Sequence, residues 1–253
     1  MKIQYCSDLH LEFDENIAFL KQNPLVPSGE ILVIAGDFYL LGAKREFISD
    51  ILTYLSKNWK AVFWLPGNHE YYHYSASNAH LEQLEEITEN VFWVNNKSVE
   101  MNDIRFVFTT LWSHIRPENV SYCESGVSDF KAISYNLKRL RSNEFNFLNR
   151  ESLKFIRQEL RVSKAYNKIV VTHHVPTYIN YPSIYLGSRI NDAFVSDNVE
   201  LIEEYQPDFW IYGHSHVNTP EFNIGKTRLV TNQLGYVKEY ENKLFRKDAV
   251  IEI

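Results

Sequence analysis

The apolar positions of the chain fall into short runs separated by polar segments, the pattern of alternating strands and helices. Residues 2–6 alternate between apolar and polar side chains. Residues 31–35 are apolar throughout, as expected for a strand that is buried on both faces. Similar runs predict further strands at 61–65, 91–94, 104–109, 168–172 and 209–212.

Between these runs, apolar residues recur every three or four positions at 43–55 and 78–88, which predicts two amphipathic covering helices. A third helix is expected at 198–205, started by a capping box of Asp197 and Glu200. Strands that alternate with helices favour parallel βαβ units. The predicted fold class is therefore α/β.

Three segments depart from this rhythm. Residues 113–160 are polar and aromatic, with helical spacing in their second half, and we expect a cap-like insertion over the sheet at about 113–160. Residues 177–194 read as a loop, and strands at 227–231 and 249–253 predict an antiparallel end. A length of 253 residues fits a single domain, 1–253.

Charge and cysteine content narrow the function classes. A formal net charge of −6 does not favour nucleic acid as a partner, because nonspecific binding depends on many basic contacts to phosphate. No apolar run reaches the length of a membrane span, and the first strand begins too early for a signal peptide. The two cysteines form no metal or redox motif, so we expect reduced thiols and a cytoplasmic protein.

Polar motifs follow five of the apolar runs, where the carboxyl ends of parallel strands would gather their side chains. Carboxylate oxygen and imidazole nitrogen are the ligands of hard and borderline cations, and two neighbouring cations need a shared ligand, usually a carboxylate. The motifs are Asp8-Leu9-His10, Gly36-Asp37, Gly67-Asn68-His69-Glu70, Thr172-His173-His174 and Gly213-His214-Ser215-His216.

The identity and order of these motifs resemble the calcineurin-like metallophosphoesterase superfamily, over residues 8–216. The stretch 170–236 is also similar to a subgroup of predicted phosphoesterases with Thr-His-His-x-Pro and Trp-Ile-x-Gly-His-x-His motifs. The resemblance implies a four-layer α/β/β/α sandwich with metals at the carboxyl ends of the strands.

The resemblance also implies a role for each residue. Asp8, His10 and His216 would bind a first metal ion, Asn68, His173 and His214 a second, and Asp37 would bridge them. A hydroxide between the metals would be the nucleophile, and His69 would protonate the leaving group. The two ions would be divalent or mixed-valence, chosen from Mn, Fe, Zn, Mg and Ni.

Several points stay open at this level. Many relatives carry a second Asp that orients the catalytic histidine, but Leu40 stands at that position here. Either His173 or His174 could be the ligand, although the family pattern favours His173. Substrate contacts are assigned to Asn68, His114 and Arg189.

The expected function is hydrolysis of phosphate esters, either monoesters or diesters, at a dinuclear metal site. The alternatives are a nuclease that uses the same site and a non-catalytic interaction scaffold. The expected partner is a small phosphate ester, and the oligomeric state is left open.

Overall fold

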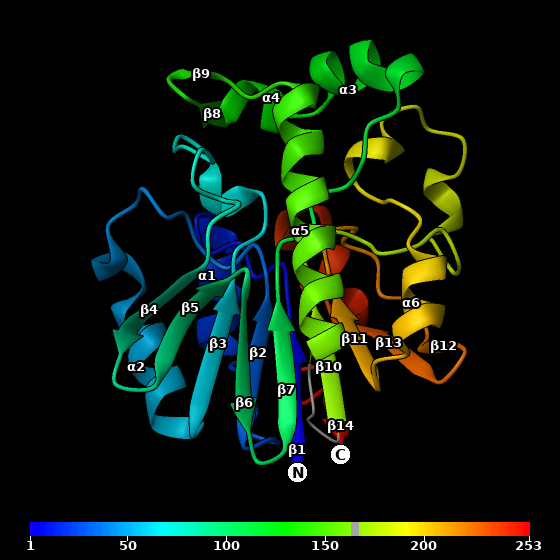
Figure 1. The fold of residues 1–253 in the computed structure, drawn as a ribbon. Coiled ribbons are helices and arrows are strands. Elements are labelled where there is room, and N and C mark those ends of the chain that lie inside the picture. The colour runs from blue at the N-terminus through cyan, green and yellow to red at the C-terminus, as the bar shows by residue number, and fades with distance from the viewer. Residues whose placement is uncertain (163–166) are drawn as a thin grey trace.

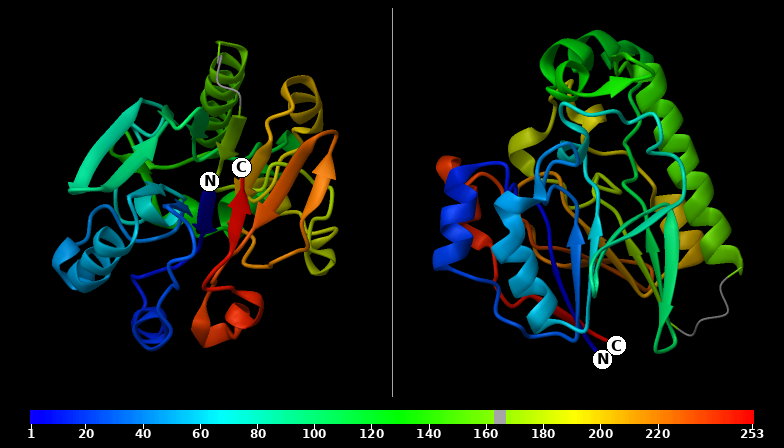
Figure 2. Two further views of the ribbon diagram at one scale, coloured as in Figure 1. Left: turned by 90° about the horizontal axis from the view of Figure 1, so that it is seen from below. Right: turned by 90° about the vertical axis from the view of Figure 1, so that its left-hand side faces the viewer.

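The computed structural model describes residues 1–162 and 167–253, which form two sheets packed face to face with helices on both outer sides (Figure 1). The right-hand view in Figure 2 shows the same order of helix, sheet, sheet and helix. This is the α/β/β/α sandwich that the family resemblance implies.

The first sheet has the strand order β14-β1-β2-β3-β5-β4. Its four central strands are parallel, and the strands at its two edges run antiparallel to their neighbours. The strands are β1 (Lys2–Cys6), β2 (Ile31–Ala35), β3 (Ala61–Leu65), β4 (Gln83–Thr88), β5 (Val91–Asn95) and β14 (Val250–Glu252).

The second sheet has the order β12-β13-β11-β10-β7-β6, again with parallel central strands and antiparallel edges. Its strands are β6 (Lys97–Met101), β7 (Ile104–Phe108), β10 (Asn167–Val171), β11 (Phe209–Tyr212), β12 (Phe222–Ile224) and β13 (Thr227–Thr231).

Strand β2 shows why the central runs are apolar throughout. Ile31, Val33 and Ala35 belong to the core between the two sheets, whereas Leu32 and Ile34 pack beneath the outer helices. Both faces of the strand are therefore out of water. The helices that cover the first sheet are α1 (Asp14–Gln22) and α2 (Ser49–Asn58), and those that cover the second are α5 (Ser142–Val162) and α6 (Val199–Tyr205).

The segment 113–160 contains α3 (Val120–Gly126), α4 (Asp129–Ala132), a two-stranded hairpin of β8 (Ser134–Tyr135) and β9 (Lys138–Arg139), and most of α5. Its elements before α5 lie at the end of the molecule opposite the chain termini, where the parallel strands finish (Figures 1 and 2). A separate apolar cluster, which includes Trp112, Phe130 and Phe145, supports this segment.

Two sequence-based predictions are wrong in detail, and a third is incomplete. Residues 83–88 form strand β4, not part of a helix, and they pair with β5, so the backbone groups of β5 do not lie at an open edge. Asp197 accepts a hydrogen bond from Thr177 Oγ1, 3.1 Å away, and α6 begins after Asn198 without a side-chain cap. The antiparallel end is confirmed for β14, which pairs with β1, and for the pairing of β13 with β12, but β13 also pairs in parallel with β11, which the sequence did not predict.

Among the described residues, no helix combines the length and the apolar character that crossing a membrane requires.

Candidate metal centre

The five polar motifs meet at the carboxyl ends of the parallel strands. Asp8 and His10 follow β1, Asp37 follows β2, and His214 and His216 follow β11. All five residues have positive φ, between 47° and 75°. This left-handed conformation costs a non-glycine residue free energy and recurs at functional sites, where it turns side chains inward from strand ends.

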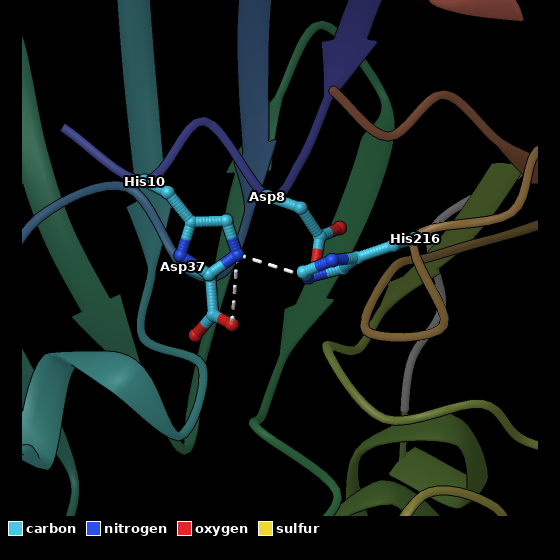
Figure 3. A group of neighbouring side chains, drawn as sticks. All are labelled: Asp8, His10, Asp37 and His216. Carbon is cyan, nitrogen blue, oxygen red and sulfur yellow. Dashed lines mark hydrogen bonds and ion pairs between the residues drawn. The ribbon is translucent and has the colours of Figure 1, made fainter. Parts of the chain in front are cut away.

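Asp8, His10, Asp37 and His216 form the first cluster of potential ligands (Figure 3). The Nε2 atoms of His10 and His216 are 2.9 Å apart, and His216 Nε2 lies 3.4 Å from Asp8 Oδ1. Asp37 Oδ2 is 3.6 Å from His10 Nε2. Ligands at right angles around a cation, each about 2.1 Å away, would be about 3 Å apart, so these distances fit one ion.

Asp37, His173 and His214 form the second cluster. His173 Nε2 lies 3.3 Å from Asp37 Oδ2, 3.1 Å from His214 Nδ1 and 3.1 Å from Asn68 Oδ1. The same oxygen, Asp37 Oδ2, therefore faces both clusters. That is the position a bridging carboxylate must occupy between two cations.

The other ring nitrogens of the cluster histidines contact oxygen acceptors. His10 Nδ1 is 3.0 Å from Glu12 Oε1, His216 Nδ1 is 2.7 Å from Glu241 Oε2, and His173 Nδ1 is 2.9 Å from the carbonyl oxygen of Ala35. A ring N–H donated to such an acceptor leaves the opposite lone pair facing the cluster. Facing lone pairs about 3 Å apart need a cation or a proton between them, so the residues fit metal ions.

The pKa pattern agrees with this geometry. Burial acts to lower the pKa of His216, but Asp8 and Glu241 raise it to about 10, whereas burial keeps the pKa of His10 below its usual value. In the second cluster, burial is outweighed by Asp37, which raises the pKa of His173 to about 9, while burial and neighbouring histidines hold that of His214 well below normal. In each facing pair, the carboxylates favour a positive charge on one imidazole and leave the other neutral, as expected where a cation is to be held.

Two glycines make room for the centre. A Cβ atom on Gly36 would lie 2.1 Å from His173 Nδ1, and one on Gly67 would lie 2.2 Å from Asp37 Oδ1. Side chains at these positions would displace a candidate ligand. The requirement for close approach explains the glycines in two of the motifs.

His69 lies beside the first cluster, and Glu12 is the carboxylate that orients it. His69 Nδ1 is 2.8 Å from Glu12 Oε1, and His69 Nε2 is 3.2 Å from the hydroxyl of Tyr236. Burial acts to lower the pKa of His69, but the charge of Asp37 and the hydrogen bond with Glu12 raise it above the usual value. Leu40 cannot orient the catalytic histidine as the second Asp of many relatives does. Glu12, two positions after His10, takes that role here.

His174 packs against the second cluster but is not one of its potential ligands. Its side chain is fully buried, its ring centroid lies 4.1 Å from that of His214, and neither ring nitrogen has a hydrogen-bond partner among the described residues. Burial lowers the pKa of His174 to about 3. Of the two adjacent histidines, it is His173 that the fold brings to Asp37 and Asn68.

Two buried carboxylates hold the motif backbones and the amide of Asn68. Glu70 accepts hydrogen bonds from the backbone N–H groups of Asp37, Phe38 and Gly67. Asp129 accepts a hydrogen bond of 2.8 Å from Asn68 Nδ2. This bond fixes the amide so that Asn68 Oδ1 faces His173. Asp129 comes from the segment 113–160.

The clusters open into a cavity of about 310 Å³, and the sequence-based substrate contacts divide between this cavity and its neighbour. Asn68 lines the metal-site cavity. His114 and Arg189 line an adjacent cavity of about 960 Å³, which shares only Ser188 and Asn191 with the first. Arg189 stacks 4.5 Å over the ring of Tyr122.

The sequence reasoning missed Glu12, Glu241 and the orienting role of Asp129. Glu12 continues the alternation of Asp8 and His10, which was an available local signal. Glu241 reaches His216 from 25 positions along the chain, and no local pattern marks it.

Comparison with known proteins identifies the family to which this fold and site are similar. The family model for calcineurin-like phosphoesterases matches residues 1–218. An uncharacterized protein of Acanthamoeba polyphaga mimivirus is 30% identical over 277 residues, which cover 99% of this chain and 96% of that protein. The crystal structure of the phosphopantetheinyl hydrolase from Mycobacterium tuberculosis superposes with a TM-score of 0.68 at 16% identity, over 96% of this chain and 92% of that one.

The match of the family model over most of the chain, the shared sandwich fold and the paired carboxylate and imidazole clusters agree. The chain belongs to the calcineurin-like phosphoesterase family and is a metal-dependent phosphoester hydrolase.

Proposed function

We propose that this protein hydrolyses a small phosphate ester at a dinuclear centre held by Asp8, His10, Asp37, Asn68, His173, His214 and His216. The observation that carries the proposal is Asp37 Oδ2, which faces an imidazole of each cluster at 3.3 and 3.6 Å. Two divalent ions would lower the pKa of water and polarise a phosphoryl oxygen.

The chain supplies the proton for the leaving group through His69. Glu12 fixes its Nδ1–H, so the opposite nitrogen faces Tyr236 and the cavity. A histidine whose pKa is raised holds that proton near neutral pH. Asn68 gives one amide N–H to Asp129 and has a second available for a phosphoryl oxygen.

A small substrate is favoured over nucleic acid. The net charge of −6 lacks the broad basic surface that nonspecific phosphate contacts need. A cavity of about 310 Å³ has the size of a small-ligand site.

The test is metal analysis of Asp37→Asn beside the parent protein, with turnover of a panel of phosphate monoesters, diesters and short oligonucleotides. We expect the parent to hold two ions per chain, and the variant to lose metal and at least about 100-fold in turnover, since both ions share this ligand. Asp50→Asn, on the exposed face of α2, is the matched control. Full occupancy and full activity in Asp37→Asn would refute the assignment.

A further inference from the structure

Both ring nitrogens of His69 have partners inside the protein. Nδ1 is 2.8 Å from Glu12 Oε1, and Nε2 is 3.2 Å from the hydroxyl oxygen of Tyr236. Tyr72 stacks on the ring with centroids 4.0 Å apart, so one face is also covered. An imidazole donates protons only from its nitrogens. A substrate oxygen therefore cannot reach a proton of His69 directly while Glu12 and Tyr236 hold these positions.

Tyr236 is fixed in this position by its backbone and by its ring. Its backbone N–H donates to Glu241 Oε2 over 2.6 Å. Its ring packs against the rings of His10 and His216, with centroids 4.7 and 4.5 Å apart. Moving the hydroxyl away from His69 would therefore pull the ring away from two residues assigned as ligands of the first metal ion.

The Tyr236 side chain also borders the space into which the clusters open. It lines the metal-site cavity together with His69, Asp37 and Asn68. Among the described residues, its hydroxyl has no hydrogen-bond partner besides His69. A phenol can accept one hydrogen bond and donate another, and its usual pKa of about 10 keeps it protonated at neutral pH. When the Nε2–H of His69 donates to it, its own proton is left for an oxygen in the cavity.

We propose that Tyr236 is a further catalytic residue, which passes the proton of His69 to the leaving oxygen of the substrate. The inference rests on the proposed function, in which His69 is the source of that proton. As the bond between phosphorus and the leaving oxygen breaks, its electron pair stays on that oxygen, which takes the proton of the Tyr236 hydroxyl. The Tyr236 oxygen takes the Nε2 proton of His69. Tyr236 ends the step unchanged, and His69 ends it neutral.

Tyr236→Phe removes the hydroxyl and keeps the ring, so it separates proton transfer from packing. The substrates are an ethyl and a p-nitrophenyl ester of the phosphate class that the parent protein turns over. We expect kcat for the ethyl ester to fall by roughly 10- to 100-fold, and kcat for the p-nitrophenyl ester by less than about 3-fold, because the second leaving group needs little protonation. KM and the content of metal ions should not change.

The matched control is Tyr240→Phe, at an exposed tyrosine four positions further along the chain, which should leave both rates unchanged. Equal losses for the two esters in Tyr236→Phe, or no loss for either, would overturn the inference and leave the proposed function standing. No turnover of either ester by parent protein that holds two metal ions would instead overturn the proposed function.

A double variant shows whether Tyr236 acts through His69. Two groups that serve one proton transfer are not additive in their effects, because removing either one already stops the transfer. Adding Tyr236→Phe to His69→Ala should therefore change kcat for the ethyl ester by less than about 2-fold. A double variant whose loss is the product of the two single losses would show that Tyr236 acts independently of His69, and would overturn the inference.

Nitrogen NMR of the metal-free protein tests the contact without turnover. With ¹⁵N-labelled histidine, the spectrum of His69→Ala identifies the two ring signals of His69. Tyr236→Phe should shift the Nε2 signal by several parts per million, because this nitrogen loses its hydrogen-bond partner, whereas Tyr240→Phe should shift neither signal. An Nε2 signal that stays in place in Tyr236→Phe would show that the hydroxyl does not bind His69, and would overturn the inference.

Discussion

Glu12 is the residue on which two histidines of the site depend. One carboxylate oxygen lies 3.0 Å from His10 Nδ1 and 2.8 Å from His69 Nδ1. It therefore couples a candidate metal ligand to the candidate proton donor. The two histidines also lie edge to face, with ring centroids 4.5 Å apart. Their side chains are therefore in direct contact.

Loss of the proton donor should depend on the leaving group. We expect His69→Ala to retain two metal ions while kcat falls by roughly 10² to 10⁴ for an alkyl leaving group, and much less for an aryl one, which needs little protonation. Steady-state kinetics with both ester types and metal analysis make the measurement. Equal losses for both leaving groups would argue against the acid role.

Glu12→Gln should give a milder form of the same defect. The amide keeps an acceptor for one histidine but removes the negative charge that holds the proton on His69. At saturating metal, the expected loss falls on the alkyl leaving group and largely disappears in the His69→Ala background, because both changes act on one proton transfer. Glu15→Gln, exposed on α1, is the control. Additive losses in the double variant would show that Glu12 acts elsewhere.

At the scale of elements, an ion pair fastens the segment 113–160 to the loop 177–194. Arg116 donates to Asp192 through its side chain and its backbone N–H, and Asn119 Nδ2 adds a bond of 2.9 Å. Burial acts to raise the pKa of Asp192, but these donors lower it below the usual value. Residues of both segments line both cavities, so this contact helps to fix the shape of the cavities.

The lowered pKa of Asp192 has a defined consequence for stability. A carboxyl group whose pKa is depressed by folding stabilises the protein above its unfolded pKa of about 3.9, and this stabilisation is lost as pH falls through the folded value. Asp192→Asn should therefore cost about 1.5–3 kcal/mol at pH 7, with a smaller difference below about pH 4. Urea unfolding of both proteins at several pH values measures it. A difference that grows on acidification would contradict the argument.

At the scale of the whole molecule, the candidate metal ligands come from both sheets. Asp8 and Asp37 follow strands of the first sheet, and His173 and His214 follow strands of the second. Ions bound between them would cross-link the layers at the ends of the strands. Residues held in left-handed conformations there would also be constrained by the same bonds.

Metal binding should therefore raise the thermal stability of the entire chain. A ligand that binds only the folded state adds about 2.7 kcal/mol at a free concentration 100 times its Kd. We expect Tm to fall after exhaustive chelation and to rise again with the concentration of added Mn²⁺ or Zn²⁺. Asp37→Asn should show a smaller rise. A Tm that is insensitive to verified metal removal would mean that the centre does not bridge the sheets.

The sequence determined the central strands and the candidate ligands because both carry local signals. A strand such as β2 needs apolar residues on both faces, and each ligand motif follows directly from such a run. The spacing of apolar residues did not predict the correct conformation of residues 83–88, because a spacing of three fits a helix. Their strand conformation depends on pairing with β5, which no local pattern encodes.

Only the tertiary structure decided which groups support the ligands. Glu241 and Asp129 reach His216 and Asn68 across long stretches of chain, and Arg189 turns to Tyr122 rather than to the metal-site cavity. It also brought His173, and not His174, to Asp37, because the two side chains leave the end of β10 in different directions. Ligand identity is a property of residue type and order, whereas orientation, charge balance and cavity shape arise from contacts that exist only after folding.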